Sequence, residues 1–289
     1  MKNNTMKKLV AIPVSKLHPF EGHPYKVLDN EEMYTLIDSI QTQGILSPLI
    51  VRPLENTTDE YEVVSGHRRL HAAQKAGLET VPALIHAIDR DTAAIVVVDS
   101  NLHREHILPS EKAFAYKMKA DALSHQGRTS GQFVPKSDDA RTTAQIGEPY
   151  GESYKTVQRY IRLTHLIPEL LDWMDEGKMA LSVGVELSYL SHEAQRCVWE
   201  ECRANDCTPS YSQAFHMKNL YKDGNLSHYE ISEMLSQEKP NQRETLKIPM
   251  DKLRDRLPQN LSVQQQEEFV LKAVDYYKKF LHRQRERER

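Results

Sequence analysis

Residues 61–73 contain the side chains best suited to binding phosphate. Their sequence, Tyr-Glu-Val-Val-Ser-Gly-His-Arg-Arg-Leu-His-Ala-Ala, passes from a short β-type run through Gly66 into a helix that opens with Arg68 and Arg69. A glycine lets a ligand approach the backbone closely, and a helix start offers unpaired N–H groups and the positive end of its dipole to an anion. Guanidinium groups match phosphate geometry better than ammonium groups do. The pattern therefore predicts a phosphate-binding turn.

A second polar cluster, Asn101-Leu-His-Arg-Glu105, follows further along the chain and could complete such a site. Either cluster alone is weak evidence, because an arginine pair at a helix start is more often a solvated or ion-paired surface. The phosphate-binding interpretation is favoured because the same chain carries a second signal of phosphate chemistry, directed at DNA.

That second signal is a helix-turn-helix pattern between Thr143 and Ile161. Gly147 is small where two helices would cross, Gly151 lies in the turn, and Val157 and Ile161 would pack the second helix against the first. Pro149 departs from the pattern, because a proline shortens or kinks the first helix. An ordinary helical hairpin with a solvated face is the alternative.

The exposed positions of the second helix carry side chains that contact DNA in other proteins. Arginine reads guanine, glutamine reads adenine, and lysine, serine and threonine hold phosphates. The segment is locally basic, although the whole chain has a net charge of −3. The predicted DNA-binding residues are Thr142, Ser153, Tyr154, Lys155, Thr156, Gln158, Arg159 and Arg162.

The composition is that of a soluble globular protein. Of the 289 residues, 39% are hydrophobic and 27% are charged, and this length suggests about two domains. The net charge argues against indiscriminate coating of nucleic acid but not against local recognition. No run approaches the roughly 18 apolar residues of a membrane span, and the Leu9–Val14 run is too short for a signal peptide. We expect a cytoplasmic protein without a membrane partner.

Three cysteines, Cys197, Cys202 and Cys207, are spaced five residues apart. Steps of this length turn about 500° around a helix, so successive thiols do not share a face. A metal site completed by His192 or His216 is possible by composition, but free thiols in a reducing compartment are the favoured interpretation.

Alternating strands and helices must position the first cluster. Asp29–Gln43 has apolar residues on one helical stripe and ends at Gly44. The chain is expected to be helical or extended from Thr92 and helical from Pro109 towards His125. The other expected elements are strands at Val10–Val14, Pro48–Pro53, Tyr61–Val64 and Val81–Ala87, and a helix at Gly66–Ala76.

Beyond a mobile connection at Gly127–Asp139, only helices are predicted. The last of these, from about Val263, has an apolar stripe between Val270 and Leu281, which is either a dimer seam or a cover for the protein's own core. A second linker is expected at Ser236–Thr245. The other helices are expected at Thr142–Ile146, Ser153–Leu163, Pro168–Glu176, His192–Ala204, Tyr211–Lys222 and His228–Leu235.

With these motifs placed, the chain resembles the ParB family of partition proteins over roughly residues 8–205. Four motifs occur in the family's order, which is far more specific than any one of them. They are Gly44-Ile-Leu-Ser-Pro-Leu-Ile-Val-Arg-Pro53, Ser65-Gly-His-Arg-Arg69 with Ala72 and Ala73, Asn101-Leu-His-Arg-Glu105 followed by Pro109-Ser-Glu111, and the helix-turn-helix.

The resemblance implies a nucleoid-associated homodimer that recognises a palindromic site in double-stranded DNA, binds CTP with Mg²⁺ and closes as a clamp around DNA. It implies a role in chromosome or plasmid partition, with a partition ATPase as a further partner. By position, the nucleotide would contact Gly44, Ser47, Gly66, His67, Arg68, Arg69 and Arg104, and the metal would contact Asn101 and Glu105.

Three positions depart from the family pattern. His67 replaces the usual Glu of the Gly-Glu-Arg-Arg motif, Ser47 replaces a Gln, and Ser100 replaces a Glu that is linked to hydrolysis. Nucleotide binding is therefore favoured over efficient hydrolysis, no catalytic residue is assigned, and the chain is at most a weak CTP hydrolase. A nucleoid-occlusion-type or transcriptional regulator and a phosphoryl-transfer or nuclease enzyme stay open as alternatives.

The expected fold class is α+β. A small mixed α/β ParB-like domain that binds nucleotide (residues 8–125) precedes an all-helical domain with the helix-turn-helix (126–235). A C-terminal helical region (246–289) is a candidate for dimerisation.

Overall fold

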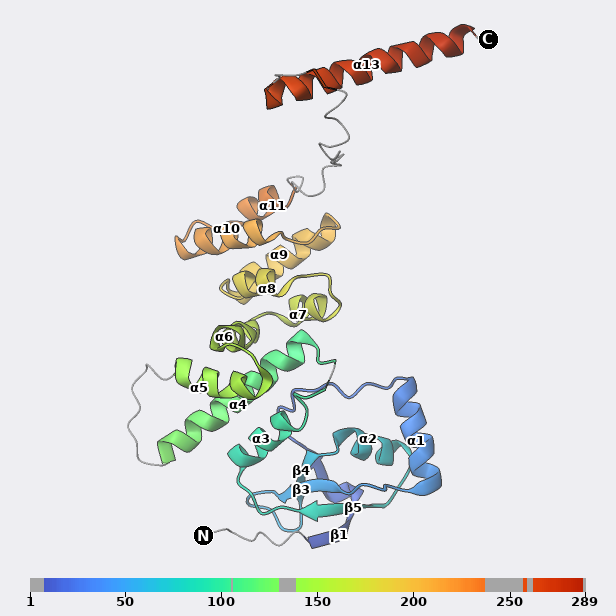
Figure 1. Ribbon diagram of the computed structural model, residues 1–289. Helices are drawn as coiled ribbons and strands as arrows, with labels where there is room; N and C mark the ends of the chain where they lie inside the picture. Colours follow the sequence, from blue (N-terminus) through green and yellow to red (C-terminus); the bar gives the residue numbers. More distant parts are fainter. Residues whose placement is uncertain (1–7, 105, 130–138, 237–256, 259–261, 288–289) are drawn as a thin grey trace. The chain divides into compact units, whose positions relative to one another are not determined.

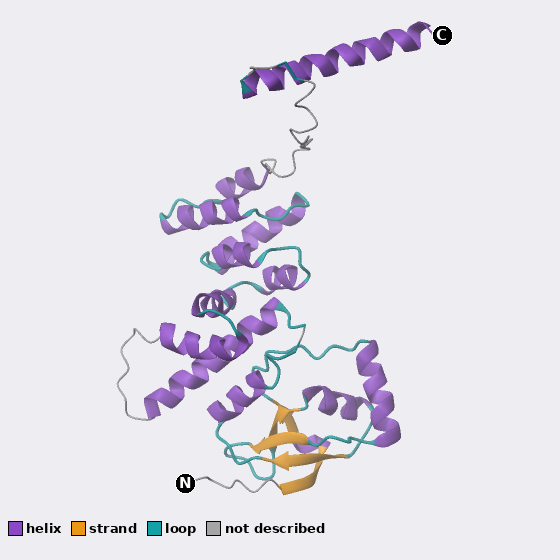
Figure 2. Ribbon diagram, in the orientation of Figure 1, coloured by secondary structure: helices purple, strands orange, loops and turns teal. Residues whose placement is uncertain are grey.

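The computed structural model describes residues 8–104, 106–129, 139–236, 257–258 and 262–287 (Figure 1). These residues form two compact units, within Met1–Gln237 and Glu238–Arg289. The first unit contains a five-stranded sheet with helices and then an all-helical region, so the predicted α+β class is confirmed (Figure 2). The three predicted domain boundaries stay predictions.

The sheet is mixed, with the strand order β1-β5-β3-β4-β2. The pairs β1–β5 and β3–β4 are antiparallel, whereas β3–β5 and β2–β4 are parallel. Four of the strands were expected from the sequence, and β2 was not. The strands are β1 (Lys8–Pro13), β2 (Leu17–Pro19), β3 (Leu49–Pro53), β4 (Tyr61–Ser65) and β5 (Thr80–Ile85), with a 3-10 helix at Val14–Lys16 between β1 and β2.

Helices α1 (Glu31–Gln43), α2 (His67–Lys75) and α3 (Arg90–Asp99) accompany the sheet. Leu70 and Ala73 of α2 pack against buried valines and leucines of the strands. Met33 and Ile40 of α1 pack against the second layer, at Ala72 of α2. The sheet therefore packs against α2, and α2 packs against α1. This order places the starts of α1 and α2 near each other.

The sheet also buries an ion pair. Arg52 of β3 and Glu62 of β4 are each 3% exposed, and Arg52 Nε lies 2.6 Å from Glu62 Oε2. The other oxygen, Glu62 Oε1, accepts a hydrogen bond from the Glu21 N–H at 3.0 Å. A buried carboxylate needs such partners, so this pair ties the loop after β2 to the sheet.

The helical region packs around Leu163, Leu170, Leu187 and Met217, all of which are fully buried. All six helices expected here are present, whereas α8 was missed. The region contains α4 (Pro109–Thr129), α5 (Asp139–Gly147), a 3-10 helix at Glu148–Tyr150, α6 (Tyr154–Leu163), α7 (Pro168–Asp175), α8 (Leu181–Leu187), α9 (His192–Ala204), α10 (Tyr211–Lys222) and α11 (His228–Ser236).

Helix α4 is longer than expected, because it extends through Thr129. Both ends of the connection predicted at Gly127–Asp139 are therefore helical, because α4 includes Gly127–Thr129 and α5 begins at Asp139. Residues 130–138 lie outside the described residues, as does all of the second predicted linker beyond Ser236.

The second unit contains α13 (Val263–Arg287). Leu271, Val274, Tyr276 and Tyr277 on this helix are between 59% and 75% exposed. The use of its apolar stripe stays a prediction. Among the helices that the structure describes, none has the length and apolar content needed to cross a bilayer.

Candidate functional site: a phosphate pocket beside a helix-turn-helix

Gly66 links the end of β4 to the start of α2 in a left-handed conformation, with φ 104° and ψ 26°. The first hydrogen bond within α2 runs from the Leu70 N–H to the Gly66 carbonyl at 2.9 Å. The N–H groups of residues 67–69 therefore have no partner inside the helix, and no side chain of the described residues caps them. The geometry is that of an anion-binding turn, and phosphate binding here stays a prediction.

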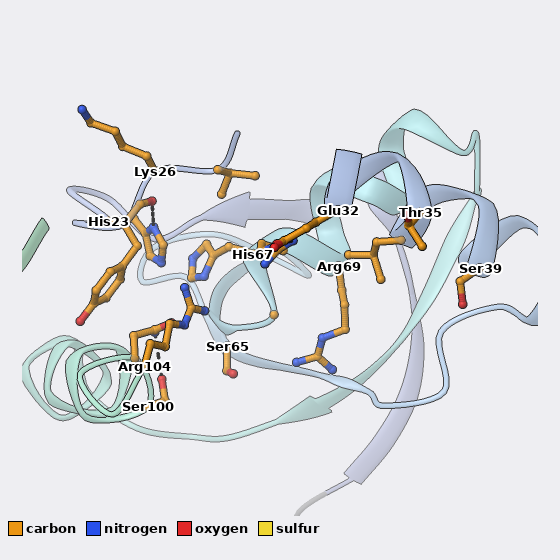
Figure 3. Close-up of a pocket in the computed structure, with 16 residues that line it drawn as sticks. His23, Lys26, Glu32, Thr35, Ser39, Ser65, His67, Arg69, Ser100 and Arg104 are labelled. Carbon is orange, nitrogen blue, oxygen red and sulfur yellow. Dashed lines mark hydrogen bonds and ion pairs between the residues drawn. The ribbon is translucent and has the colours of Figure 1, made fainter. Parts of the chain in front are cut away.

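A cavity of about 590 Å³ opens in front of this turn (Figure 3). Its volume is in the range of pockets that hold nucleotide-sized ligands. We call it the Gly66 pocket. Four segments line it: His23, Tyr25, Lys26 and Val27 after β2; Glu32, Thr35, Leu36 and Ser39 of α1; Ser65, Gly66, His67, Arg68 and Arg69 at the turn; and Ser100, Asn101 and Arg104 after α3.

Four cationic side chains and one carboxylate line the Gly66 pocket. Arg68 Nη2 lies 3.1 Å from Glu32 Oε2, and both side chains are substantially exposed. Such an exposed ion pair contributes little stability, so a phosphate group can replace Glu32 as the partner of the Arg68 guanidinium. The Arg104 guanidinium stands over the Tyr25 ring, 5.7 Å from its centroid. Both arginines are therefore available to a polyanion.

Arg69 has a different environment. Its Nη1 donates to the carbonyl of Ser47 and to the carbonyl of Pro48, the latter at 2.9 Å. Burial lowers the pKa of the Arg69 guanidinium. Arg69 therefore fastens the loop before β3 to the start of α2, besides lining the pocket.

Gly44 and Ser47 do not line the pocket. Gly44 ends α1 with φ 71°, and the exposed Ser47 turns its carbonyl, not its hydroxyl, towards Arg69. Their predicted contact with a nucleotide stays a prediction.

His67 lines the pocket next to His23. The two ring centroids are 3.7 Å apart and the planes are tilted by 34°, with Arg104 beside them (Figure 3). The Phe20 N–H donates to His67 Nε2 at 3.3 Å. Burial, with smaller contributions from His23 and Arg104, lowers the pKa of His67 to about 3. His67 is therefore neutral and holds the loop after β2 against α2.

Asn101 is 8% exposed. Its Nδ2 donates to the Val97 carbonyl at 2.8 Å and to Ser100 Oγ at 3.2 Å, which leaves the amide oxygen Oδ1 as an acceptor. An amide oxygen is a suitable ligand for Mg²⁺. Glu105, the second predicted metal ligand, lies outside the described residues. Within the described residues, no three His, Cys, Asp or Glu side chains are grouped to hold a metal ion.

Lys26 was not anticipated as a site residue. Its side chain extends from the pocket to α7, where Nζ lies 3.1 Å from Asp175 Oδ2 and 3.3 Å from Asp172 Oδ1. Asp175 also accepts from the Ser110 N–H at 2.9 Å. The loop after β2, α4 and α7 therefore meet at one polar junction.

The predicted helix-turn-helix is present as α5, a 3-10 turn and α6. A Cβ at Gly147 would lie 2.4 Å from the Glu152 carbonyl oxygen, so only glycine fits the crossing. Gly151 has φ 68° in the turn, and Val157 is fully buried. Pro149 lies in the 3-10 helix Glu148–Tyr150, so it ends α5 early, as expected.

Most of the predicted DNA-binding residues share the exposed face of α6. Ser153 caps the helix by accepting from the Thr156 N–H at 3.2 Å, while Thr156 and Thr142 are half-buried. Arg162 is engaged elsewhere: it donates to the Ser188 carbonyl at 2.8 Å and stacks over the Tyr189 ring. The exposed members are Ser153, Tyr154, Lys155, Gln158 and Arg159.

The turn of the helix-turn-helix is fixed to α3 and α4. Tyr150 OH donates to Asp99 Oδ1 at 2.8 Å, and Lys119 Nζ of α4 lies 2.6 Å from the same oxygen. Glu152 accepts from Tyr116 OH at 2.8 Å and pairs with Lys112. Asp99 is adjacent to Ser100 of the Gly66 pocket, so one carboxylate connects the pocket wall to the helix-turn-helix.

Comparisons with known proteins agree with this architecture. Residues 1–102 match the family described as the ParB N-terminal domain. The chromosome-partitioning protein Spo0J of Thermus thermophilus is 32% identical over 192 residues, which are 66% of this chain and 63% of that protein. A probable chromosome-partitioning protein ParB of Neisseria meningitidis is 36% identical over 167 residues, 56% of this chain and 57% of that protein. The N-terminal part of this chain is therefore a ParB N-terminal domain.

A further relative carries a different functional name. The nucleoid occlusion protein of Listeria innocua is 31% identical over 135 residues, 47% of either chain. The aligned parts span between 47% and 63% of these three curated relatives, which is less than two thirds of their lengths.

Two solved structures of the C-terminally truncated ParB from Caulobacter crescentus are also similar. One, complexed with CTP-γ-S, is 24% identical with a TM-score of 0.32 and covers 67% of this chain and 98% of that chain. The other, complexed to the centromeric parS site, is 22% identical with a TM-score of 0.41 and covers 78% and 98%. Superpositions this loose carry no correspondence between individual residues.

Proposed function

We propose that this protein is a partition protein that binds a palindromic DNA site as a homodimer and holds CTP in the Gly66 pocket. The supporting observation is that one compact unit, which begins with a ParB N-terminal domain, contains both a cationic pocket at a helix start and an exposed helix-turn-helix face, joined at Asp99. Clamp closure around DNA and a partition ATPase partner follow from the family resemblance and belong to the same proposal.

The triphosphate would lie against the free N–H groups at the start of α2. Arg68, released from Glu32, and Arg104 would pair with its oxygens, because guanidinium forks match phosphate geometry. Asn101 Oδ1 would hold Mg²⁺, together with Glu105 as the resemblance implies. When bound, the metal ion neutralises phosphate charge. The α1 side chains Thr35, Leu36 and Ser39 are left to contact the nucleoside.

We further propose that the nucleotide is bound and not efficiently hydrolysed. Ser100 stands where the family carries a Glu, and the neighbouring carboxylate of Asp99 does not replace it. Asp99 Oδ1 is already the partner of Lys119 at 2.6 Å and of Tyr150 OH at 2.8 Å. A carboxylate held in this way is not free to orient or deprotonate a water molecule.

The DNA side of the proposal depends on α6. Tyr154, Lys155, Gln158 and Arg159 are exposed on a helix that Gly147 and Val157 hold rigidly against α5. One such face reads a half-site only weakly. Two copies that engage a palindrome together multiply their affinities, which is the reason for expecting a dimer.

The experiment recovers the DNA bound by the protein in cells and then measures binding of that duplex and of a scrambled duplex. Arg159→Ala is expected to lose the discrimination, about 1–3 kcal/mol for a base-reading arginine, and to keep its nucleotide affinity. Arg68→Ala is expected to lose nucleotide affinity and to keep its fold. Arg196→Ala, an exposed arginine of α9, is the matched control. Unchanged discrimination in Arg159→Ala would contradict the proposal.

A role in nucleoid occlusion is the second candidate, and the similarity to the Listeria innocua protein favours it. Both candidates use the same DNA chemistry. They differ in the partner expected, because a partition role implies a partition ATPase, whose gene would neighbour the gene of this chain. Inspection of the neighbouring genes therefore separates the two.

A further inference from the structure

A pair of neutral histidines forms one wall of the Gly66 pocket. His23 follows β2 and His67 opens α2, and their rings stack with centroids 3.7 Å apart (Figure 3). The family resemblance places a Glu at position 67, so this pair belongs to the present chain and not to the family pattern. Two imidazoles beside a proposed binding site for a polyanion can bind a proton there.

The hydrogen bonds of the two imidazole rings fix the positions of their protons. His23 Nδ1 lies 2.9 Å from the Tyr25 carbonyl oxygen, so Nδ1 carries the proton and donates it. His23 Nε2 is then a bare acceptor nitrogen. His67 Nε2 already accepts a hydrogen bond from the Phe20 N–H, and a protonated Nε2 would lose this bond. The free protonation position of the pair is therefore His23 Nε2.

The surroundings that the protein itself provides disfavour a proton at that position. Burial lowers the pKa of His23; the hydrogen bond to the Tyr25 carbonyl opposes this in part, and the Arg104 cation lowers the pKa a little further. The ionisable or charged groups that face His23 are Tyr25 on its own loop, His67 on α2 and Arg104 after α3. Lys26 is held by Asp172 and Asp175. A triphosphate would reverse this field, because it brings several negative charges against the same nitrogen.

We propose that His23 is a phosphate-binding residue that takes up one proton from solvent when the triphosphate enters the Gly66 pocket. The proton adds to Nε2, and the imidazolium donates it as a hydrogen bond to a phosphate oxygen, while Nδ1–H keeps the Tyr25 carbonyl. The inference rests on the proposed nucleotide binding and adds its regulation by pH. His67 stays neutral and acts as the stacking partner that positions His23.

The sign of the pH effect follows from linkage. Because the bound state holds one proton more than the free state, affinity for nucleotide increases as pH falls between the two pKa values of His23. Uptake of a whole proton changes the dissociation constant tenfold per pH unit, and partial uptake changes it proportionally less. The terminal phosphate of the nucleotide titrates in a similar range, so a reference variant is needed.

The test titrates CTP with Mg²⁺ into the full chain by calorimetry at pH 7 in buffers of different ionisation enthalpy, which counts protons exchanged per nucleotide. His23→Gln is the reference, because a glutamine amide can still donate to the Tyr25 carbonyl but cannot ionise. We expect the wild type to take up between half a proton and one proton more than His23→Gln, by the linkage above. Equal proton numbers in the two proteins would overturn the inference.

The nitrogen-15 spectrum of the wild-type histidine rings gives a second measurement that needs no variant. With CTP bound at pH 7, His23 is expected to show an imidazolium signal and His67 a neutral one. A neutral His23 in the saturated complex would also overturn the inference. Absence of any CTP binding would instead remove the proposed function, so the two failures are distinguishable.

Discussion

Replacing Gly147 by alanine should disrupt the placement of the DNA-reading helix. The added Cβ would lie 2.4 Å from the Glu152 carbonyl oxygen and 3.0 Å from Val157 Cγ2, and contacts below 3.0 Å do not persist in proteins. The clash is with backbone that is itself bonded back to Gly147, since the Glu152 N–H donates to the Gly147 carbonyl at 3.0 Å. The turn cannot rotate away, so α6 must shift by about 0.6 Å or more.

Overpacking of this kind costs about 1–3 kcal/mol, and a backbone clash belongs in the upper half of that range. Urea unfolding followed by circular dichroism would measure this loss. A displaced α6 that loses one bidentate base contact would bind its site about 5- to 150-fold more weakly, corresponding to about 1–3 kcal/mol. The measurement is fluorescence anisotropy with the cognate duplex, under conditions in which the variant is folded.

Gly151→Ala is the matched control. Nothing lies within 4 Å of the position that the alanine methyl group would occupy, and the φ of 68° imposes only a backbone cost, about 1–2 kcal/mol. This variant should lose similar stability and keep its DNA affinity. Wild-type stability and DNA affinity in Gly147→Ala would refute the idea that a close helix crossing places α6.

Two further predictions concern the sheet and the pocket. Arg52→Met should destabilise the first unit by about 3–5 kcal/mol in urea unfolding, because it leaves the buried Glu62 carboxylate without its cation. Adding Glu62→Leu should recover most of this loss. Wild-type stability of Arg52→Met would contradict this prediction. Gly66→Ala should weaken CTP binding measured by calorimetry, because φ 104° is strained for alanine and the new Cβ would lie 3.0 Å from Arg69 Nη2; unchanged affinity would show that the turn does not shape the pocket.

Much of the fold was predictable because local pattern and tertiary packing agree. The apolar stripe of Asp29–Gln43 is the face that α1 buries, through Met33 and Ile40. The helix predicted at Tyr211–Lys222 has those bounds, because Ser210 and Gln213 form a capping box at its start. Glycines mark the helix crossing and both turns, where backbone geometry leaves no choice of residue.

The elements that were missed depend on distant contacts. Strand β2 is three residues long and exists because Leu17 and Pro19 pair with β4 far along the chain. Helix α8 has a poor helix former at Gly184, whose backbone packs closely against Met174 and Leu163. Neither element has a local pattern that could be recognised.

The site was partly predictable for the same reason. Gly66, Arg68 and Asn101 lie in contiguous motifs, and the structure places all three in one cavity. The contributions of His23 and Lys26 could not be foreseen, because they come from an irregular loop whose position depends on the Phe20–His67 hydrogen bond and on α7. The engagement of Arg162 by Ser188 likewise depends on α8, which the sequence did not indicate.

The most direct test of the account is equilibrium binding of CTP with Mg²⁺ to the purified chain in the presence of its recovered DNA duplex or of a scrambled duplex. We expect saturable binding of one nucleotide per chain, loss of that binding in Arg68→Ala, and a different affinity with the two duplexes, because Asp99 joins the pocket wall to Tyr150 of the helix-turn-helix. No saturable binding with either duplex would contradict it.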